Sequence, residues 1–593
     1  MQQHPRLALE SGTVHRVLAC ALALIACGAS APAGAGVQYR VEVNAPEALA
    51  EPLRVSLGLV RWQEDPDVTP EQLRRLVDEA TRDARAVAAA EGYFSALARV
   101  NIDETVTPWR ITVQVVPGER TLVAEVDLRV IGPAATDPEA QERIADVRKA
   151  WQLTRDQPFR QEDWDLSKQG AVGRLSGWRY AAARIAESEA RIDAAARTAH
   201  LRVVLDSGPS YRFGPLVVSG TQRYAPTLVE NMSPVRPGED YDREQLVVYR
   251  RRLVETGYFS SVLADIDARS ADPAAAPLRV AVIEAPAKQF EAGVSYNTDV
   301  GARLQLRYSD HDLRGADWRL RSSLSLDDQI QEAQLDLDSP PKNEGRFNNW
   351  FARAKRQDIQ NELARTFSLG VAHNFGTDVA PSAAIVSWTL EEQQAGTDPI
   401  DNRYAVYLGF RRTLRRTDAV IAPRAGYFAA IDLGGAPGAL ASEAFLRVAG
   451  EGSTFFPVGR KGDLALRAQV GRVLADERTG IPTTFLFRTG GDQTVRGYAF
   501  ESLGVSEGNA VVGGRRLFVA SAEYTHWVSG DFGVAAFVDA GNAWDSGERF
   551  RAAIGYGVGG RIRTPIGPAR LDVAYGEDTG EFRLHVSIGY VFR

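Results

Sequence analysis

The sequence predicts three α+β repeats followed by an all-β, 16-stranded transmembrane barrel. Two observations lead to this fold class. From about 37 to 286 the chain repeats one helix-containing pattern three times. From about 288 the helical period disappears, and apolar residues alternate with polar ones. Alternation over strands of about ten residues is typical of a membrane barrel, because one face of each strand contacts lipid and the other faces the lumen.

The first segment, 1–35, has the features of a secretory signal peptide. Two arginines precede a short apolar run, Val17–Cys27, and small residues follow it. The run is too short to span a bilayer, so we expect export. Cys20 and Cys27 are the only cysteines, which excludes a disulfide framework in the mature chain. The stretch Leu24–Gly28 also matches a bacterial lipobox, so lipidation of Cys27 stays open as an alternative to later cleavage.

Composition narrows the classes of protein. The net charge of −7 disfavours a protein that binds nucleic acid through a basic face. No later stretch contains the 18 or so apolar residues that a transmembrane helix needs. An exported chain of this kind is either a soluble periplasmic or secreted protein or an outer-membrane barrel. A soluble β-sandwich is disfavoured because aromatic residues recur near strand ends, as they do at membrane interfaces.

The three repeats share a landmark, a glycine followed by aromatic residues at the end of a helix. Their spacing of about 80 residues indicates a tandem array. The first long helix should begin at Thr69, with Pro70 and Gln72 completing an N-terminal cap. Two strand-like stretches follow each glycine, so each unit has β-α-α-β-β order. The predicted boundaries are 37–117, 118–208 and 209–286.

The predicted barrel occupies 288–593. Counting the stretch 475–512 as one long loop, we find 16 alternating segments. An even number suits a closed bacterial barrel. The first strand should cover about 288–298 and the last about 581–592.

Strings that resemble catalytic motifs lack the required context. Gly504–Gly508 matches G-x-S-x-G, but no helix follows it. Gly555–Gly560 matches G-x-G-x-x-G, but an alternating strand continues from it. The seven histidines show no metal-ligand spacing; they stand at positions 4, 15, 200, 311, 373, 526 and 585. We therefore expect no enzyme activity, no catalytic residues, no cofactor and no metal site.

One arginine and one aspartate stand out near the end of the chain. Asp539 lies in an otherwise apolar strand next to Val538, and adjacent strand residues point to opposite faces. A carboxylate inside a barrel needs a partner, and arginine is the bidentate match. Arg496 in the long loop is the candidate, since Gly497 allows a tight turn and Tyr498 can pack on the inner wall. On residues alone, a solvated arginine in a surface loop is an equally good interpretation.

These residues belong to a recognisable set of motifs. Val495-Arg496-Gly497-Tyr498 precedes a Val538-Asp539-Ala540-Gly541 strand, and the stretch 559–572 adds G-x-R and P-I-G-P-x-R-x-D. The set resembles the superfamily of outer-membrane assembly and two-partner-secretion barrels, from residue 37 to the end. Its N-terminal repeats are POTRA domains. Three repeats and 16 strands look most like the TamA-type members, which are outer-membrane subunits of the translocation and assembly module. BamA-like members usually carry five repeats, and two-partner-secretion members carry two.

The resemblance implies roles for individual residues. Arg496 should contact Asp539 in the lumen and anchor the sixth extracellular loop, with Gly497, Tyr498 and Gly541 completing this lumen latch.

A second set of residues concerns the lateral seam between the first and last strands. Gly293 and Gly589 lower strand propensity there, and a partly unpaired edge can template an incoming strand. Simple barrel geometry explains these glycines equally well. The alternating last strand ends on Phe592, although Arg593 follows where such barrels usually finish on an aromatic residue.

The expected function is assembly of outer-membrane proteins, such as autotransporters, in a Gram-negative outer membrane. By resemblance, the POTRA domains lie in the periplasm and bind a TamB-like, inner-membrane-anchored partner. The barrel contacts outer-membrane lipid, and neither ATP nor nucleic acid is involved. The alternative is a two-partner-secretion-type export pore for one exoprotein, and a general barrel-assembly core is a third possibility. A passive porin is disfavoured by the long N-terminal region.

Overall fold

The computed structural model describes residues 36–342, 344–419, 423–564 and 567–592. The predicted signal peptide, the lipidation candidate Cys27 and Arg593 lie outside the described residues. The chain divides into two compact units, the first ending at Ser210 and the second beginning at Tyr211.

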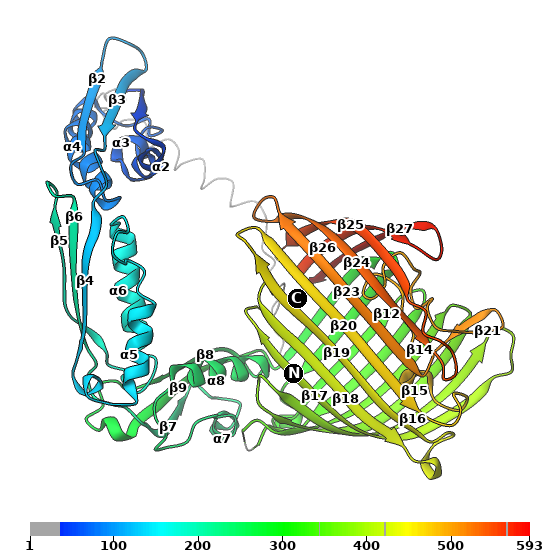
Figure 1. The fold of residues 1–593 in the computed structure, drawn as a ribbon. Coiled ribbons are helices and arrows are strands. Elements are labelled where there is room, and N and C mark those ends of the chain that lie inside the picture. Colours follow the sequence, from blue (N-terminus) through cyan, green and yellow to red (C-terminus); the bar gives the residue numbers. More distant parts are fainter. Residues whose placement is uncertain (1–35, 343, 420–422, 565–566, 593) are drawn as a thin grey trace, which may run out of the picture. The chain divides into compact units, whose positions relative to one another are not determined.

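The first unit contains two α+β repeats of the same topology (Figure 1). In each, the first strand pairs in parallel with the last, which also pairs antiparallel with the middle strand. The elements of the first repeat are β1 (Tyr39–Asn44), α2 (Glu47–Ser56), α3 (Gly58–Arg61), α4 (Pro70–Ala90), β2 (Leu97–Asp103) and β3 (Trp109–Val116). Those of the second are β4 (Leu122–Ile131), η1 (Pro133–Ala135), α5 (Ala140–Lys149), α6 (Gln161–Leu175), β5 (Arg184–Asp193) and β6 (Thr198–Asp206).

Helix α4 begins as its sequence predicts. The Thr69 side chain accepts a hydrogen bond from the Gln72 backbone, and the Gln72 side chain accepts one from the Thr69 backbone. The chain leaves the helix through Gly92, whose φ of +91° favours glycine. The buried face of α4, which includes Leu73 and Ala84, then packs in the core of this repeat.

The second unit opens with a third repeat of the same kind. Its elements are β7 (Phe213–Ser219), α7 (Pro226–Glu230), α8 (Arg243–Glu255), β8 (Phe259–Ile266), η2 (Pro273–Ala275) and β9 (Ala276–Glu284). Arg252 of α8 donates to Asp378, which lies in a barrel turn, over 3.0 Å. The Tyr258 hydroxyl donates to the Asp317 carbonyl of another turn over 2.7 Å. These turns lie at the end of the strands opposite the long loop, so the third repeat is bound to that end.

The rest of the second unit is a closed barrel of 16 antiparallel strands, which confirms the predicted fold class. The first half consists of β10 (Lys288–Asn297), β11 (Gly301–Asp310), β12 (Arg319–Leu326), β13 (Ile330–Asp338), β14 (Phe347–Ile359), β15 (Glu362–Gly376), β16 (Pro381–Ala395) and β17 (Asp401–Thr417). The second half consists of β18 (Gly426–Ala436), β19 (Phe445–Val458), β20 (Gly462–Leu474), β23 (Arg516–Trp527), β24 (Phe532–Trp544), β25 (Ala553–Thr564), β26 (Gly567–Gly576) and β27 (Glu581–Phe592).

The barrel strands separate an apolar outer face from a polar or buried inner face. In β24, Val534 and Val538 are 56% and 47% exposed, whereas Phe537 and Asp539 between and beside them are buried. This is the lipid-out pattern expected of a membrane barrel. In the described part of the chain, no helix combines the length and the apolar character needed to cross a bilayer.

Candidate functional site: a charged cluster around the long loop

The long loop between β20 and β23 lies against the inner wall of the barrel. It contains the short helix η5 (Thr483–Phe485) and a hairpin of β21 (Val505–Glu507) and β22 (Ala510–Val512). Val495, Arg496 and Tyr498 are all buried, and Arg496 is only 1% exposed. The Val495–Tyr498 segment is therefore enclosed by the barrel.

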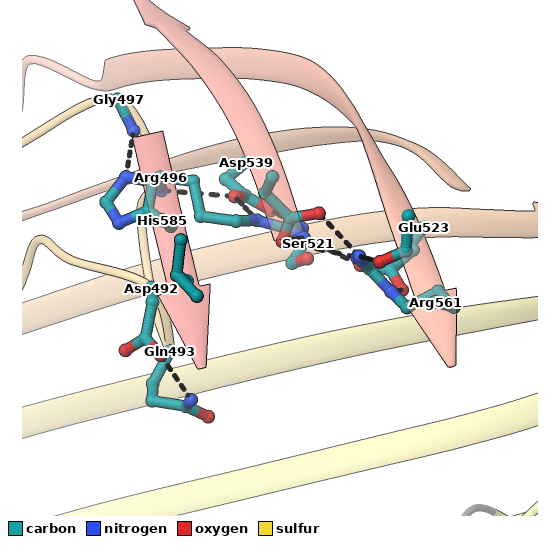
Figure 2. A network of polar contacts seen from close by, with 12 residues as sticks. Asp492, Gln493, Arg496, Gly497, Ser521, Glu523, Asp539, Arg561 and His585 are labelled. Atoms are coloured by element: carbon teal, nitrogen blue, oxygen red, sulfur yellow. Dashed lines mark hydrogen bonds and ion pairs between the residues drawn. The ribbon is translucent and has the colours of Figure 1, made fainter. Parts of the chain in front are cut away.

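Arg496 is bound to Asp539 by three hydrogen bonds (Figure 2). Its Nε donates to Oδ2 over 2.7 Å and its Nη2 to Oδ1 over 2.9 Å, in the bidentate arrangement. The Arg496 backbone N–H also donates to Oδ2 over 3.1 Å. Asp539 is fully buried, so the side chain and the backbone of the loop together satisfy a carboxylate that water does not reach.

Three further charged residues complete the cluster, and none was among the predicted site residues. Arg496 Nη1 donates to Glu523 of β23 over 2.7 Å and to Asp572 of β26 over 3.3 Å. Arg561 of β25 donates to Glu523 over 2.9 Å and also to Asp572. Arg496 thus joins the loop directly to β23, β24 and β26, and Arg561 of β25 completes the cluster. Arg561 and Asp572 stood in the motif that carries the family resemblance, whereas nothing local distinguishes Glu523 in its strand.

An aromatic ring completes the seat of the guanidinium. The Arg496 Cζ atom lies 3.4 Å from the centroid of the Phe537 ring. A cation held over an aromatic face is attracted by the ring quadrupole, and more strongly so where water is excluded. Phe537 is 5% exposed, so this contact adds to the charge pairs.

The other predicted residues of this site lie nearby but act differently. Gly497 has a φ of +92°, and a Cβ there would lie 2.8 Å from the Tyr575 carbonyl carbon, so a side chain would not fit. The Tyr498 hydroxyl donates to the Ile554 carbonyl over 3.2 Å. At Gly541 the nearest neighbours of an added Cβ are on the adjacent strand, where it would come within 2.7 Å of the Phe518 carbonyl oxygen. Its smallness serves strand packing.

Gly555, which the sequence showed only as part of a G-x-G-x-x-G string, also belongs to this site. A Cβ at Gly555 would overlap the carbonyl oxygen of Arg496. Gly555→Ala should therefore displace the loop and lower the free energy of unfolding by about 1–3 kcal/mol. The measurement is the urea concentration at which half of the folded band is lost in electrophoresis. Gly560→Ala on the same strand is the control, because its Cβ would meet nothing within 4 Å. Equal effects of the two substitutions would show that close contact with the loop is unimportant.

The loop also contacts both strands of the seam. His585 of β27 accepts a hydrogen bond from the Gly497 backbone over 3.2 Å (Figure 2). Its Nδ1 lies 3.3 Å from Asp299, which follows β10 and accepts a hydrogen bond from the Asp492 backbone over 2.6 Å. Burial raises the pKa of the Asp492 carboxyl, and the adjacent charge of Asp299 raises it further. The loop thus joins the first and last strands near its own tip.

The seam itself is closed by a short ladder. Strand β10 pairs with β27 from Ala292 opposite Phe592 to Asn297 opposite Ser587. The ladder between β15 and β16 is much longer, since it runs from Glu362 opposite Ala395 to Gly376 opposite Pro381. The predicted seam residues Gly293 and Gly589 do not face each other. Gly293 lies opposite Val591, and Gly589 lies opposite Ser295.

A second attachment ties the beginning of the loop to the opposite wall. The backbone and hydroxyl of Thr483 donate to Glu391 over 2.7 and 2.8 Å. Phe485 stacks on Tyr407 with the ring centroids 4.8 Å apart. Arg488 pairs with Glu362 over 2.9 Å. The sequence offered no motif for this attachment.

Comparison with known proteins agrees with the architecture. A family model described as the Omp85 superfamily domain matches residues 286–592. BamA from Haemophilus ducreyi lacking POTRA domains 1–3 is 14% identical, with a TM-score of 0.56, over 79% of this chain and 100% of that one. CdiB from Acinetobacter baumannii is 14% identical, with a TM-score of 0.45, over 80% of this chain and 91% of that one. The BamA structure shows the same fold. Because the family model covers more than half of its length, the chain belongs to the Omp85 superfamily of outer-membrane assembly and secretion barrels.

Proposed function

We propose that this chain is a TamA-type assembly factor that helps to insert or translocate autotransporters and other outer-membrane proteins. The observation that carries the proposal is the presence of three α+β repeats before a 16-stranded barrel. We assign these repeats, 37–117, 118–208 and 209–286, as three POTRA domains in the periplasm. The barrel, 288–593, lies in the outer membrane, and the segment 1–35 is the export signal.

The role of the charged cluster is to latch the loop inside the barrel. Arg496 supplies one of two guanidinium groups to three carboxylates, those of Glu523, Asp539 and Asp572. Removing it would leave carboxylates with too little positive charge in a buried site, which is strongly unfavourable. The latch therefore holds the loop against β23–β26 while the adjacent seam of the barrel works on a substrate.

The working surface is the seam of β10 and β27. Among the described residues its ladder covers six positions, from Ala292–Phe592 to Asn297–Ser587, so opening it breaks few hydrogen bonds. The freed edges then offer backbone donors and acceptors to a strand of the incoming protein. The energy comes from strand pairing and burial in lipid, and no nucleotide is needed.

The N-terminal repeats provide edges for partners. Strands β2, β5 and β8 each lie at the edge of a three-stranded sheet. Such an edge can accept one extra strand from another chain by β-augmentation. We assign the edge of the first repeat to a TamB-like protein that is anchored in the inner membrane.

Quantitative proteomics of the outer membrane and the culture supernatant after deletion of the gene tests this function. Selective loss of autotransporters or a few complex barrels from the membrane is the expected result. Loss of one large secreted protein with an unchanged membrane proteome would instead identify a dedicated export pore. A general fall of all barrel proteins would identify a barrel-assembly core.

A further inference from the structure

Two arginines on the outer face of the barrel lie directly opposite each other. Arg472 near the end of β20 pairs in register with Arg516 at the start of β23. Their strand neighbours of the same facing, Val470 and Phe518, are 50% and 39% exposed. Gly471 lies between Val470 and Arg472 on β20 and faces the lumen, because a Cβ added there would meet the Phe487 ring of the loop. Both guanidinium groups therefore belong to the lipid-facing surface.

Neither arginine is neutralised by a neighbour. Among the described residues, no ion pair or hydrogen bond of either side chain is present. Directly opposed like charges on neighbouring strands destabilise a sheet. The pair thus has an unfavourable interaction that an external anion would relieve.

A second outward pair of arginines provides a contrast. Arg356 and Arg365 also lie directly opposite each other, on β14 and β15. Each of them has its own carboxylate, with Arg356 2.8 Å from Asp358 and Arg365 3.3 Å from Glu392. The protein's own carboxylates therefore neutralise the Arg356–Arg365 pair, whereas the Arg472–Arg516 pair keeps its positive charge.

The surroundings of Arg472 and Arg516 fit the boundary between lipid tails and head groups. Trp544 lies opposite Arg516 on the next strand. Its ring and that of Phe518 both contact Phe550, with centroids 4.7 and 5.7 Å from it. Tryptophan and its aromatic neighbours are typical of the interfacial girdle of a barrel. Positive charge at this level meets lipid phosphates, whereas the apolar residues below meet acyl chains.

We propose that Arg472 and Arg516 form a binding site for the phosphate of an outer-leaflet glycolipid, with acyl chains against Val470 and Phe518. The leaflet follows from the position of the pair, at the end of the strands opposite the turns that bind the third repeat. With the repeats in the periplasm, this rim is on the outside. Two guanidinium groups can share the oxygens of one phosphate by charge-assisted hydrogen bonds. The bound lipid would contact the outer rim of the barrel at one place, beside β20 and β23.

The test measures binding of diphosphoryl lipid A to the full-length, detergent-purified protein by native mass spectrometry. Arg472→Gln/Arg516→Gln should bind the lipid roughly a hundredfold more weakly, or tenfold for each guanidinium removed. The control, Arg356→Gln/Arg365→Gln, should bind within about twofold of the unaltered protein, since its arginines are already neutralised. Retained heat-modifiability of both variants shows that they are folded.

A second readout separates binding from a purely structural role. Without lipid A, Arg516→Gln should raise the unfolding midpoint because it removes the like-charge contact. With saturating lipid A it should lower the midpoint relative to the unaltered protein, because less lipid is bound. Equal losses of binding in the two double variants, or no loss in Arg472→Gln/Arg516→Gln, would overturn the proposal. Competition by inorganic phosphate at the same concentration as the lipid would also overturn it, since the site would then bind the free anion.

Discussion

Arg496→Ala should release the loop from the barrel wall and lower the free energy of unfolding by about 3–5 kcal/mol. The fully buried Asp539 would lose its bidentate partner, and the aromatic contact with Phe537 would disappear. Glu523 and Asp572 would then share Arg561 alone. The measurement is the heat-modifiable mobility of the full-length protein together with its urea unfolding midpoint. Assembly of autotransporters in a deletion strain should fall in parallel.

Two related variants identify the charge pair as the cause. In Arg496→Gln/Asp539→Asn both charges are removed, so the double variant should be more stable than Arg496→Gln, and its loss of stability should be smaller than the sum of the two single losses. Arg496→Lys keeps the charge but cannot make two parallel hydrogen bonds, so it should fall between the unaltered protein and Arg496→Ala. Normal mobility and normal function of Arg496→Ala would refute the latch. Losses that simply add in the double variant would show that the two residues act independently.

The sequence predicted the fold well because the spacing of apolar residues along the chain distinguishes helices from strands. A helical period repeated three times and a two-residue period repeated 16 times are each visible along one stretch of chain, without knowledge of distant contacts. The lumen latch depended on a different signal. Asp539 was recognisable only because it interrupts an apolar strand, and Arg496 because its tetrapeptide belongs to a known motif.

What the sequence could not predict depends on register. Glu523 faces the lumen, but polar residues alternate with apolar ones in its strand as they do in the rest of the barrel. Only the pairing of β23 with β24 places Glu523 beside Arg496. His585 is likewise one of seven scattered histidines, until the closure of the barrel brings it to Gly497 and Asp299. A shift of one position would turn each of these side chains to the outer face.

Register also decides how the seam should be tested. No cysteine follows Cys27, so an introduced pair is the only possible disulfide in the described chain. Gly293 lies opposite Val591 across the seam and opposite Gln305 across the adjacent β10–β11 ladder. Facing residues of antiparallel strands have Cα atoms about 4.5–5.5 Å apart, which a disulfide can bridge. One substitution, Gly293→Cys, therefore serves both the test and its control.

Oxidised Gly293→Cys/Val591→Cys should assemble no autotransporter in a deletion strain, because the lock prevents β10 and β27 from separating. Oxidised Gly293→Cys/Gln305→Cys, which ties β10 to β11 only, should retain assembly, and a reductant should restore activity to the seam variant. Non-reducing electrophoresis measures the crosslinked fraction, and surface display of the autotransporter measures assembly. Full assembly by a completely crosslinked seam would mean that substrates do not use these edges. Equal inactivation of both variants would show that the mobility of β10, and not opening of the seam, is required. The two variants share only the cysteine at position 293 and a disulfide on that strand.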